Sequence, residues 1–321
     1  MTDVLNLVNP TNSIKYEISR FPDGQQSLRL IEENIHTFYG ITNQTIPIKI
    51  KSRLNNFQDL ELIICATQAL RGIGVKSIEL YIPYCMGARS DRKFMEGGIN
   101  YVKHVIAPII NSQNYESVTV VDPHSDVLEA CINNFKKIDN TELARFALSD
   151  YLRTQIQDGK FTDGDKIALN YDNVRFISPD AGALKKVFHV AEALKYKNEV
   201  IIASKHRNLD TGKIDYTNVH MSVTDADKDF FIFDDICDGG RTFIEIAKTI
   251  QERRNLSSSV QPKDYGNIYL VVTHGIFSAG LSELSKYFTK IYCKNSVKDK
   301  ADINFSDITI KEDFIQQLNV F

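Results

Sequence analysis

One local pattern recurs along the chain: a short β-rich run ends in polar residues suited to chemistry, and helical spacing of apolar residues usually follows. The runs are Ser77–Tyr84, Ser117–Val121, Val174–Ser178, Glu199–Ala203, Phe230–Phe233 and Asn267–Val272. Such alternation is typical of a parallel α/β sheet. Because ligands bind beyond the carboxyl ends of the strands in these sheets, we expect the polar residues after each run to form the functional site.

The pattern occurs before about residue 140 and again after it, and a chain of 321 residues favours two domains. We therefore predict two α/β domains, 1–142 and 143–295, each with a mainly parallel sheet flanked by helices. The segment 296–321 is expected to pack back on the first domain.

Composition excludes several classes of protein. The net charge of −3 leaves no broad positive field for nucleic acid or an anionic membrane. The five cysteines show neither a disulfide framework nor a zinc spacing, which favours reduced thiols in the cytoplasm. The first residues do not resemble a signal peptide, and no apolar run is long enough to predict a membrane helix.

The strongest local signal is the segment 230–242, FFIFDDICDGGRT, which leads into a helical pattern. Its paired glycines allow a tight turn whose N–H groups face an anion, and the following helix adds the positive end of its dipole. The paired carboxylates before the turn suit ribose hydroxyls or Mg²⁺ instead. A sugar phosphate satisfies both halves, whereas the alternative is a solvated acidic turn before a helix.

This segment resembles the phosphoribosyl-diphosphate (PRPP) loop of type I phosphoribosyltransferases and PRPP synthetases, usually V-D-D, two apolar residues and D-T-G-G-T. The resemblance implies that Asp234 and Asp235 hold the ribose 2- and 3-hydroxyls. It implies that the 5-phosphate is wrapped by Asp238, Gly239, Gly240, Arg241 and Thr242. Gly239 stands where the family has Thr, and Arg241 where it has Gly.

Further segments resemble the synthetases in particular, in the family's order, over roughly Phe21 to Ser296. They are Phe21–Gln25 (FPDGQ), Tyr84–Arg92 (YCMGARSDR), Val121–His124 (VDPH), Ser178–Gly182 (SPDAG), Ser204–Arg207 (SKHR) and Thr273–Gly275 (THG). The resemblance implies a fold of two phosphoribosyltransferase-like domains, of which the first binds ATP and makes the contacts between subunits. It also implies a homo-oligomer, either a dimer or a hexamer.

Roles for individual residues follow from the resemblance. ATP would be bound by Phe21, Asp23, Gln25, Arg89, Asp91 and His124, with Phe21 stacking on the adenine of a neighbouring subunit. Mg²⁺ would be held by His124 and Asp180, and catalysis would use Lys205 and Arg207 on a mobile loop. Taken alone, Arg89–Lys93 reads equally as a salt-bridged surface run, and a lone histidine is more often a hydrogen-bonded residue at a strand end.

The sequence thus predicts a Mg²⁺-dependent diphosphokinase that transfers a pyrophosphoryl group from ATP to the C1 hydroxyl of ribose 5-phosphate. Gly239 would leave the phosphate loop more open, and Arg241 would make it more positive. These two changes suggest an alternative acceptor, a 5-substituted ribose phosphate such as ADP-ribose, whose product would serve NAD synthesis. Other departures are Gln25 for Glu, Ser90 for Gln, and the stretch after His124, which bears on allosteric control. A PRPP-consuming phosphoribosyltransferase and a non-catalytic partner subunit remain as rival functions.

Overall fold

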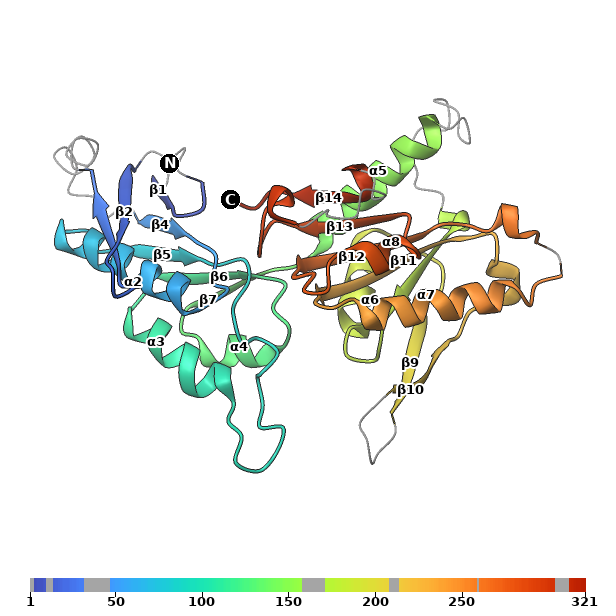
Figure 1. Cartoon of the computed structure of the whole chain (residues 1–321), viewed down its shortest axis with the longest axis horizontal. Coiled ribbons are helices and arrows are strands. Elements are labelled where there is room, and N and C mark those ends of the chain that lie inside the picture. The colour runs from blue at the N-terminus through green and yellow to red at the C-terminus, as the bar shows by residue number, and fades with distance from the viewer. Residues whose placement is uncertain are drawn as a thin grey trace. The chain divides into compact units, whose positions relative to one another are not determined.

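The structure is a computed structural model that describes residues 3–9, 14–31, 47–157, 171–207, 214–258, 260–303 and 312–321. The chain divides into two compact units (Figure 1). The first comprises Met1–Asp139 with Val320–Phe321, and the second comprises Asn140–Asn319. The division falls a few residues before the expected one at 142.

The first unit is built on a five-stranded sheet in which all strands are parallel, ordered β1-β4-β5-β6-β7. Its strands are β1 (Asp3–Asn6), β4 (Ile48–Lys51), β5 (Ile78–Tyr81), β6 (Ser117–Val121) and β7 (Phe135–Ile138). Alternate residues of β4 and β5 are buried, as expected when one face of a sheet is covered.

Helices cover the buried face of this sheet and form one hydrophobic core with it. They are α2 (Phe57–Gly72), the π-helix η2 (Val102–Ile106), α3 (Ala107–Ser112) and α4 (Asp126–Cys131). The hairpin of β2 (Tyr16–Arg20) and β3 (Gln26–Leu30) lies against α2. The π-helix ends two residues before Pro108, which has no N–H to continue an α-helical ladder.

The second unit contains a seven-stranded sheet ordered β10-β9-β8-β11-β12-β13-β14. Its strands are β8 (Val174–Ser178), β9 (Ile201–Arg207), β10 (Ile214–Val219), β11 (Asp229–Cys237), β12 (Ile268–Gly275), β13 (Lys290–Lys294) and β14 (Ile315–Leu318). Only β10 is antiparallel to its neighbour, and Figure 1 shows β9 and β10 extending away from the rest of the sheet.

The C-terminal segment differs from expectation, because it supplies β14 to the second sheet instead of packing on the first domain. Phe314 and Ile315 are buried in the core of the second unit, which holds the strand there. Only the last two residues join the first unit, where the Phe321 ring lies edge-on to Tyr81 at 6.4 Å.

Both faces of the second sheet are covered, and two hydrophobic cores result. Helices α5 (Thr141–Gln157) and α6 (Leu184–Ala193) pack on one face, and α7 (Arg241–Arg254) and α8 (Ser282–Ser285) on the other. Along β11, Phe231 and Phe233 face the α5–α6 side and Phe230 and Ile232 the α7 side. This alternation decides which helix each site residue of β11 meets.

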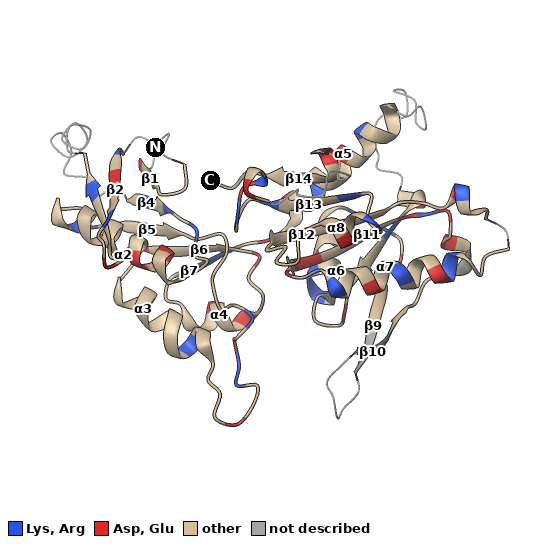
Figure 2. Cartoon of the chain, in the orientation of Figure 1, with Lys and Arg blue, Asp and Glu red and all other residues tan. Residues whose placement is uncertain are grey.

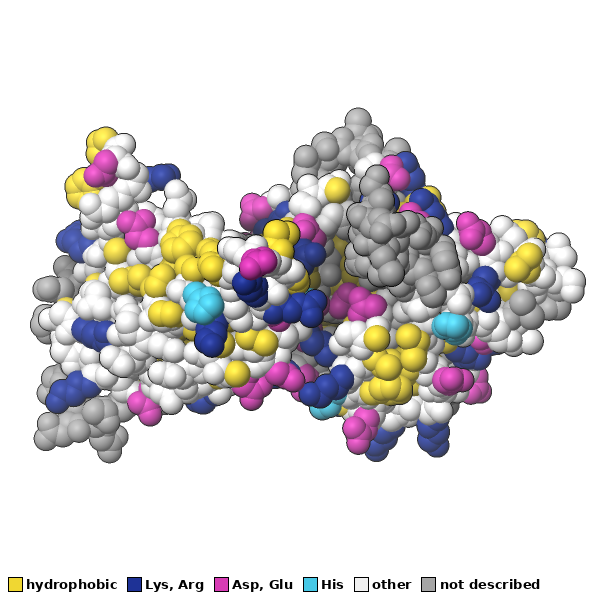
Figure 3. All heavy atoms as spheres, turned by 90° about the horizontal axis from the view of Figure 1, so that it is seen from below, with side chains coloured by type: hydrophobic (Ala, Val, Ile, Leu, Met, Phe, Trp, Pro, Cys, Tyr) yellow, Lys and Arg dark blue, Asp and Glu magenta, His cyan; other side chains and the backbone are white. Residues whose placement is uncertain are grey.

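Short 3₁₀ turns complete the second unit: η3 (Tyr171–Asn173), η4 (Val223–Asp225), η5 (Pro262–Asp264), η6 (Lys300–Asp302) and η7 (Glu312–Phe314). Acidic and basic residues alternate along α7 (Figure 2), and charges of both signs intermix on the face of the second unit seen in Figure 3. Within the described ranges, no helix combines the length and apolarity that a membrane span requires.

Candidate active site

The loop from β11 to α7 forms a turn suited to holding a phosphate. Gly240 is the N-cap of α7, and no side chain caps the first turn of that helix. The Gly240 carbonyl accepts from the N–H groups of Phe243 and Ile244 at 3.0 and 3.1 Å. The first N–H groups of a helix have no acceptor within the helix and lie at the positive end of its dipole, so this turn can bind an anion.

The two glycines of the loop have different physical reasons to be glycine. Gly240 has φ +77°, and a Cβ there would lie 3.0 Å from Leu284 Cδ2, so both backbone and packing require glycine. A Cβ on Gly239 would instead lie 3.8 Å from Ser278 Oγ, which is ordinary van der Waals contact. Position 239 therefore has room for a side chain that this sequence omits.

The acid pair lies within β11, because the strand continues through it to Cys237 instead of ending at Phe233. The strand's alternation places Asp235 on the α6 side, where its Oδ2 pairs with Lys186 Nζ at 3.1 Å. Asp235 is 5% exposed and Lys186 20% exposed. Lys186 was not singled out by the sequence, where it reads as one lysine of a helix.

Asp234 lies beside two other carboxylates. Its Oδ1 accepts from the Asp235 N–H at 2.8 Å. Burial raises the pKa of Asp234 well above its ordinary value, and the charges of Asp235 and Asp180 raise it further. This concentration of negative charge favours hydroxyl donors or a cation as the ligand.

Asp180 comes directly after β8 and shapes its own loop. Its Oδ1 accepts from the N–H groups of Gly182 and Ala183 at 3.0 and 3.1 Å, and its carbonyl accepts from Ser178 Oγ at 2.8 Å. Because β8 and β11 are adjacent and parallel, Asp180 and the acid pair share the carboxyl edge of the sheet. The second unit thus brings Asp180, Asp234, Asp235 and the loop Asp238–Thr242 together.

Lys205 and Arg207 lie in β9 and not on a loop after it. Their backbones pair with Thr217 and Ile214 of β10, so the segment forms one arm of an antiparallel hairpin. The structure describes only the backbone at these two positions. Residues 208–213, which complete the expected catalytic loop, lie outside the described residues.

In the first unit, Arg89 and Asp91 lie in a loop anchored to the start of the π-helix. The Ser90 carbonyl accepts from Tyr101 N–H at 2.9 Å, and Asn100 Nδ2 donates to the Asp91 carbonyl. Asn100 Oδ1 accepts in turn from Lys103 N–H at 2.8 Å, so this side chain serves both helix and loop. The Arg89 side chain is exposed.

His124 follows β6 after a turn through Asp122, which is buried and has φ +42°. The Asp122 N–H donates to the Ile138 carbonyl at 2.7 Å, which fixes the turn. His124 is exposed, and Ser125 next to it caps α4 by accepting from Val127 N–H. His124 therefore lies at the carboxyl edge of the first sheet, as its sequence position predicts.

Phe21, Asp23 and Gln25 form the tip of the β2–β3 hairpin. Asp23 Oδ1 accepts from Gln25 N–H at 3.2 Å, and Gly24 N–H donates to the Phe21 carbonyl at 2.9 Å. All three side chains are exposed, and Phe21 is 51% exposed. An aromatic ring presented at the tip of a hairpin can stack on the base of a nucleotide.

Asp180 suits Mg²⁺ by donor type, since this ion binds carboxylate oxygen and keeps waters and substrate phosphates as its other ligands, whereas the imidazole nitrogen of His124 is an unusual donor for it. The effect of Asp180 on the pKa of Asp234 indicates a region where a cation relieves repulsion. Among the described residues, no group of three or more His, Cys, Asp or Glu side chains is arranged to hold a metal ion by itself.

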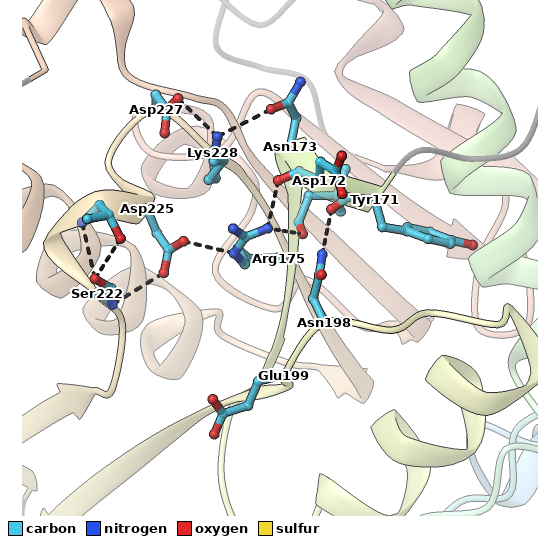
Figure 4. A network of polar contacts seen from close by, with 12 residues as sticks. Tyr171, Asp172, Asn173, Arg175, Asn198, Glu199, Ser222, Asp225, Asp227 and Lys228 are labelled. Carbon is cyan, nitrogen blue, oxygen red and sulfur yellow. Dashed lines mark hydrogen bonds and ion pairs between the residues drawn. The ribbon is translucent and has the colours of Figure 1, made fainter. Parts of the chain in front are cut away.

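The opposite, amino edge of the second sheet carries a different polar network (Figure 4). Arg175 Nε donates to Asp225 Oδ1 at 2.8 Å, and Lys228 Nζ donates to Asn173 Oδ1 at 3.3 Å. Asp225 also belongs to a capping box with Ser222. These bonds tie β8 and β11 to η3 and η4, and we assign them a structural role.

A residue that the sequence did not single out also reaches the phosphate loop. Ser278, on the turn after β12, donates from Oγ to Asp238 Oδ1 at 2.5 Å. The expected segment Thr273–Gly275 is largely β12 itself, and His274 there is buried with Nδ1 2.8 Å from Ser296 Oγ. No local signal in the sequence marks Ser278, because its contact with Asp238 depends on β12 lying beside β11.

Comparison with known proteins gives consistent similarities. No family model matches the chain. It is 24% identical over 305 residues to a ribose-phosphate pyrophosphokinase of Pyrococcus abyssi, covering 94% of this chain and 90% of that protein. It is 28% identical over 300 residues to one of Thermoplasma acidophilum, covering 92% and 86%.

The fold is similar to the crystal structure of a phosphoribosylpyrophosphate synthetase from Mycobacterium smegmatis. The TM-score is 0.67 at 16% identity, over 95% of this chain and 86% of that one. The shared architecture confirms the predicted arrangement of two phosphoribosyltransferase-like domains.

Proposed function

We propose that the chain is a divergent member of the ribose-phosphate pyrophosphokinase family and that it transfers the β,γ-pyrophosphoryl group of Mg-ATP to the C1 hydroxyl of ribose 5-phosphate, giving PRPP and AMP. The residues of the second unit would hold the acceptor, and those of the first unit would hold ATP.

One observation carries the choice of acceptor. An uncapped helix start and a carboxylate pair lie at the two ends of a single short segment, Asp234–Thr242. The helix start attracts a phosphate, and the carboxylates accept hydrogen bonds from hydroxyls. A ribose phosphate presents both groups on one small molecule.

We assign the positively charged residues of the site to binding the transferred pyrophosphoryl group. Pyrophosphoryl transfer depends on positioning and on neutralising phosphate oxygens more than on covalent catalysis. Lys205 and Arg207 would supply positive charge from the β9–β10 hairpin, and Arg89 would bind phosphates of ATP. Mg²⁺, bound near Asp180 and His124 with the phosphates of ATP, would supply further neutralisation.

The exposed tip of the β2–β3 hairpin supports a homo-oligomer. Phe21 lies at this tip half exposed, where it can reach a nucleotide bound to another copy of the chain. We propose that Phe21, Asp23 and Gln25 contact adenine in this way. A cytoplasmic location stays a prediction from the scattered cysteines.

A second acceptor, ADP-ribose, is favoured by one specific feature. The space beside Gly239 would admit a Cβ at ordinary contact distance, and Arg241 at the start of α7 is exposed. Both leave the phosphate loop more open and more positive than one with two hydroxyl side chains. The product would be ADP-ribose 1-pyrophosphate.

The purified protein tests both proposals when Mg-ATP is supplied with each acceptor and AMP is measured. AMP formation that requires ribose 5-phosphate supports the first, and AMP formation with ADP-ribose in its place supports the second. If neither acceptor yields AMP and the protein consumes PRPP with a base, a phosphoribosyltransferase replaces both.

Lys205→Ala tests the catalytic assignment, with the exposed Lys185→Ala as the matched control. We expect the first variant to keep its melting temperature and to lose most turnover, because a cation facing the transferred phosphates is removed. The control should keep turnover. Full activity in Lys205→Ala would contradict the assignment.

A further inference from the structure

The turn after β12 holds a bulky residue in a rare conformation. Phe277 has φ +48°, a region that side chains of this size seldom adopt. Its ring is buried and lies so close to Gly275 that a Cβ there would be 2.1 Å from Phe277 Cε2. Strained residues fixed by their surroundings concentrate at functional sites, and this turn lies beside the phosphate loop.

The turn brings Ser278 against the phosphate loop. Ile276 and Phe277 donate their N–H groups to the Cys237 carbonyl at 2.9 and 3.1 Å. Ser278 N–H donates to the Asp238 carbonyl at 3.2 Å, and its hydroxyl donates to Asp238 Oδ1 at 2.5 Å. Three successive backbone groups therefore fix the position of Ser278 relative to the loop.

Ser278 lies where the loop itself lacks a side chain. A Cβ on Gly239 would be 3.8 Å from Ser278 Oγ, so the serine hydroxyl borders the space that a side chain at position 239 would enter. Gly239 contributes no side chain of its own to this space. Here the hydroxyl is missing from position 239 and present on the neighbouring turn.

We propose that Ser278 belongs to the phosphate subsite and gives the acceptor's phosphate the hydroxyl that position 239 lacks. The proposal rests on the proposed function, since it concerns the phosphate of the same acceptor. It assigns a binding and specificity role to a residue contributed by β12, a different strand from the one that carries the loop.

The hydroxyl chemistry permits this role. A serine hydroxyl has one proton, so it donates either to Asp238 or to a bound phosphate. In the structure it donates to Asp238 Oδ1. When a dianionic phosphate binds, rotation about the Cβ–Oγ bond redirects the proton to a phosphate oxygen, a charge-assisted bond.

A rescue experiment tests the proposal with Ser278→Ala, Gly239→Thr and the double variant. We expect Ser278→Ala to raise the KM for the phosphorylated acceptor about tenfold, the usual scale for a hydrogen bond to a charged group. The kcat and the KM for ATP should stay within about twofold. Gly239→Thr in the Ser278→Ala background should return the acceptor KM to within about threefold of the starting protein.

Ser285→Ala serves as the control, because its hydroxyl bonds the Ser282 carbonyl within α8. It should leave the acceptor KM unchanged. An unchanged acceptor KM in Ser278→Ala overturns the proposal. So does a fall in kcat that Gly239→Thr does not rescue, since Ser278 would then act by positioning Asp238.

Binding of inorganic phosphate, measured by calorimetry without ATP, separates this proposal from the proposed function. Weaker phosphate binding by Ser278→Ala than by Ser285→Ala supports the subsite even if no acceptor yields AMP. Equal binding by the two variants overturns the subsite even if AMP is formed from ribose 5-phosphate.

Discussion

Replacing Lys186 with methionine should destabilise the second unit, because the change leaves a buried carboxylate without its ammonium partner. The pair joins Lys186 Nζ to Asp235 Oδ2 at 3.1 Å, and Asp235 is almost fully buried. Removing one partner of a buried ion pair costs roughly 3–5 kcal/mol. The Lys186 side chain is 20% exposed, so water can partly replace its ammonium group in the variant. We therefore expect the unfolding free energy to fall by about 2–3 kcal/mol.

The assay is chemical and thermal unfolding of Lys186→Met beside Lys185→Met, an exposed neighbour on the same helix. For a unit of this size each kcal/mol lowers the melting temperature by about 2–4 °C. Lys186→Met should therefore melt about 4–12 °C below Lys185→Met. Adding Asp235→Asn removes the stranded charge and should recover at least half of the loss, a coupling that a double-mutant cycle isolates.

Lys186 also bears on the acceptor, since it holds Asp235 in the orientation assigned to the ribose hydroxyls. Lys186→Met should raise the KM for ribose 5-phosphate more than the KM for ATP. The reasoning is refuted if Lys186→Met is as stable as Lys185→Met, or if Asp235→Asn recovers nothing.

Three further outcomes are expected. Gly240→Ala should lower the unfolding free energy by about 1–2 kcal/mol, because the backbone at position 240 is left-handed. The unfolding free energy of Gly239→Ala should stay within about 0.5 kcal/mol of the starting protein, and equal losses for the two variants in denaturant titrations would contradict this. Asp234 binds more protons in the folded than in the unfolded state because its pKa is raised, so its contribution to stability should fall as the pH rises above about 4. Asp234→Asn should remove this pH dependence of the unfolding free energy, as measured by unfolding curves recorded between pH 4 and 8. Asn100→Asp keeps the oxygen that caps the helix but loses the donor to the Asp91 carbonyl, so it should raise the KM for ATP with little loss of stability. Asn100→Ala loses both groups and should lower both ATP affinity and the melting temperature. Equal stability of the two variants would argue against this dual role.

The sequence predicted the central strands well because the apolar side chains that these strands bury are visible as short β-rich runs. Ser117–Val121 and Val174–Ser178 are strands with the predicted bounds. The edge strand β7 was not predicted, since its lysines face solvent and give no buried run. The C-terminal segment was assigned to the wrong partner, because a short strand does not reveal which sheet edge it joins.

The site was predictable where one segment carries several functional groups, as in Asp234–Thr242. It was not predictable where the sheet joins distant residues. Lys186 meets Asp235 from a helix 49 positions away, and Ser278 meets Asp238 from a turn 40 positions away. Neither contact has a local sequence signal, because strand order and the alternation along β11 bring each pair together.

The fate of the β-phosphorus of ATP tests the central claim most directly. The protein is incubated with Mg-ATP and ribose 5-phosphate labelled with ¹³C at C1, and the mixture is followed by ³¹P and ¹³C NMR. We predict equal amounts of AMP and of a diphosphate ester whose inner phosphorus couples to the labelled carbon. ADP with a sugar monophosphate, free pyrophosphate without a new ester, or unchanged ATP with every ribose 5-phosphate compound would contradict it.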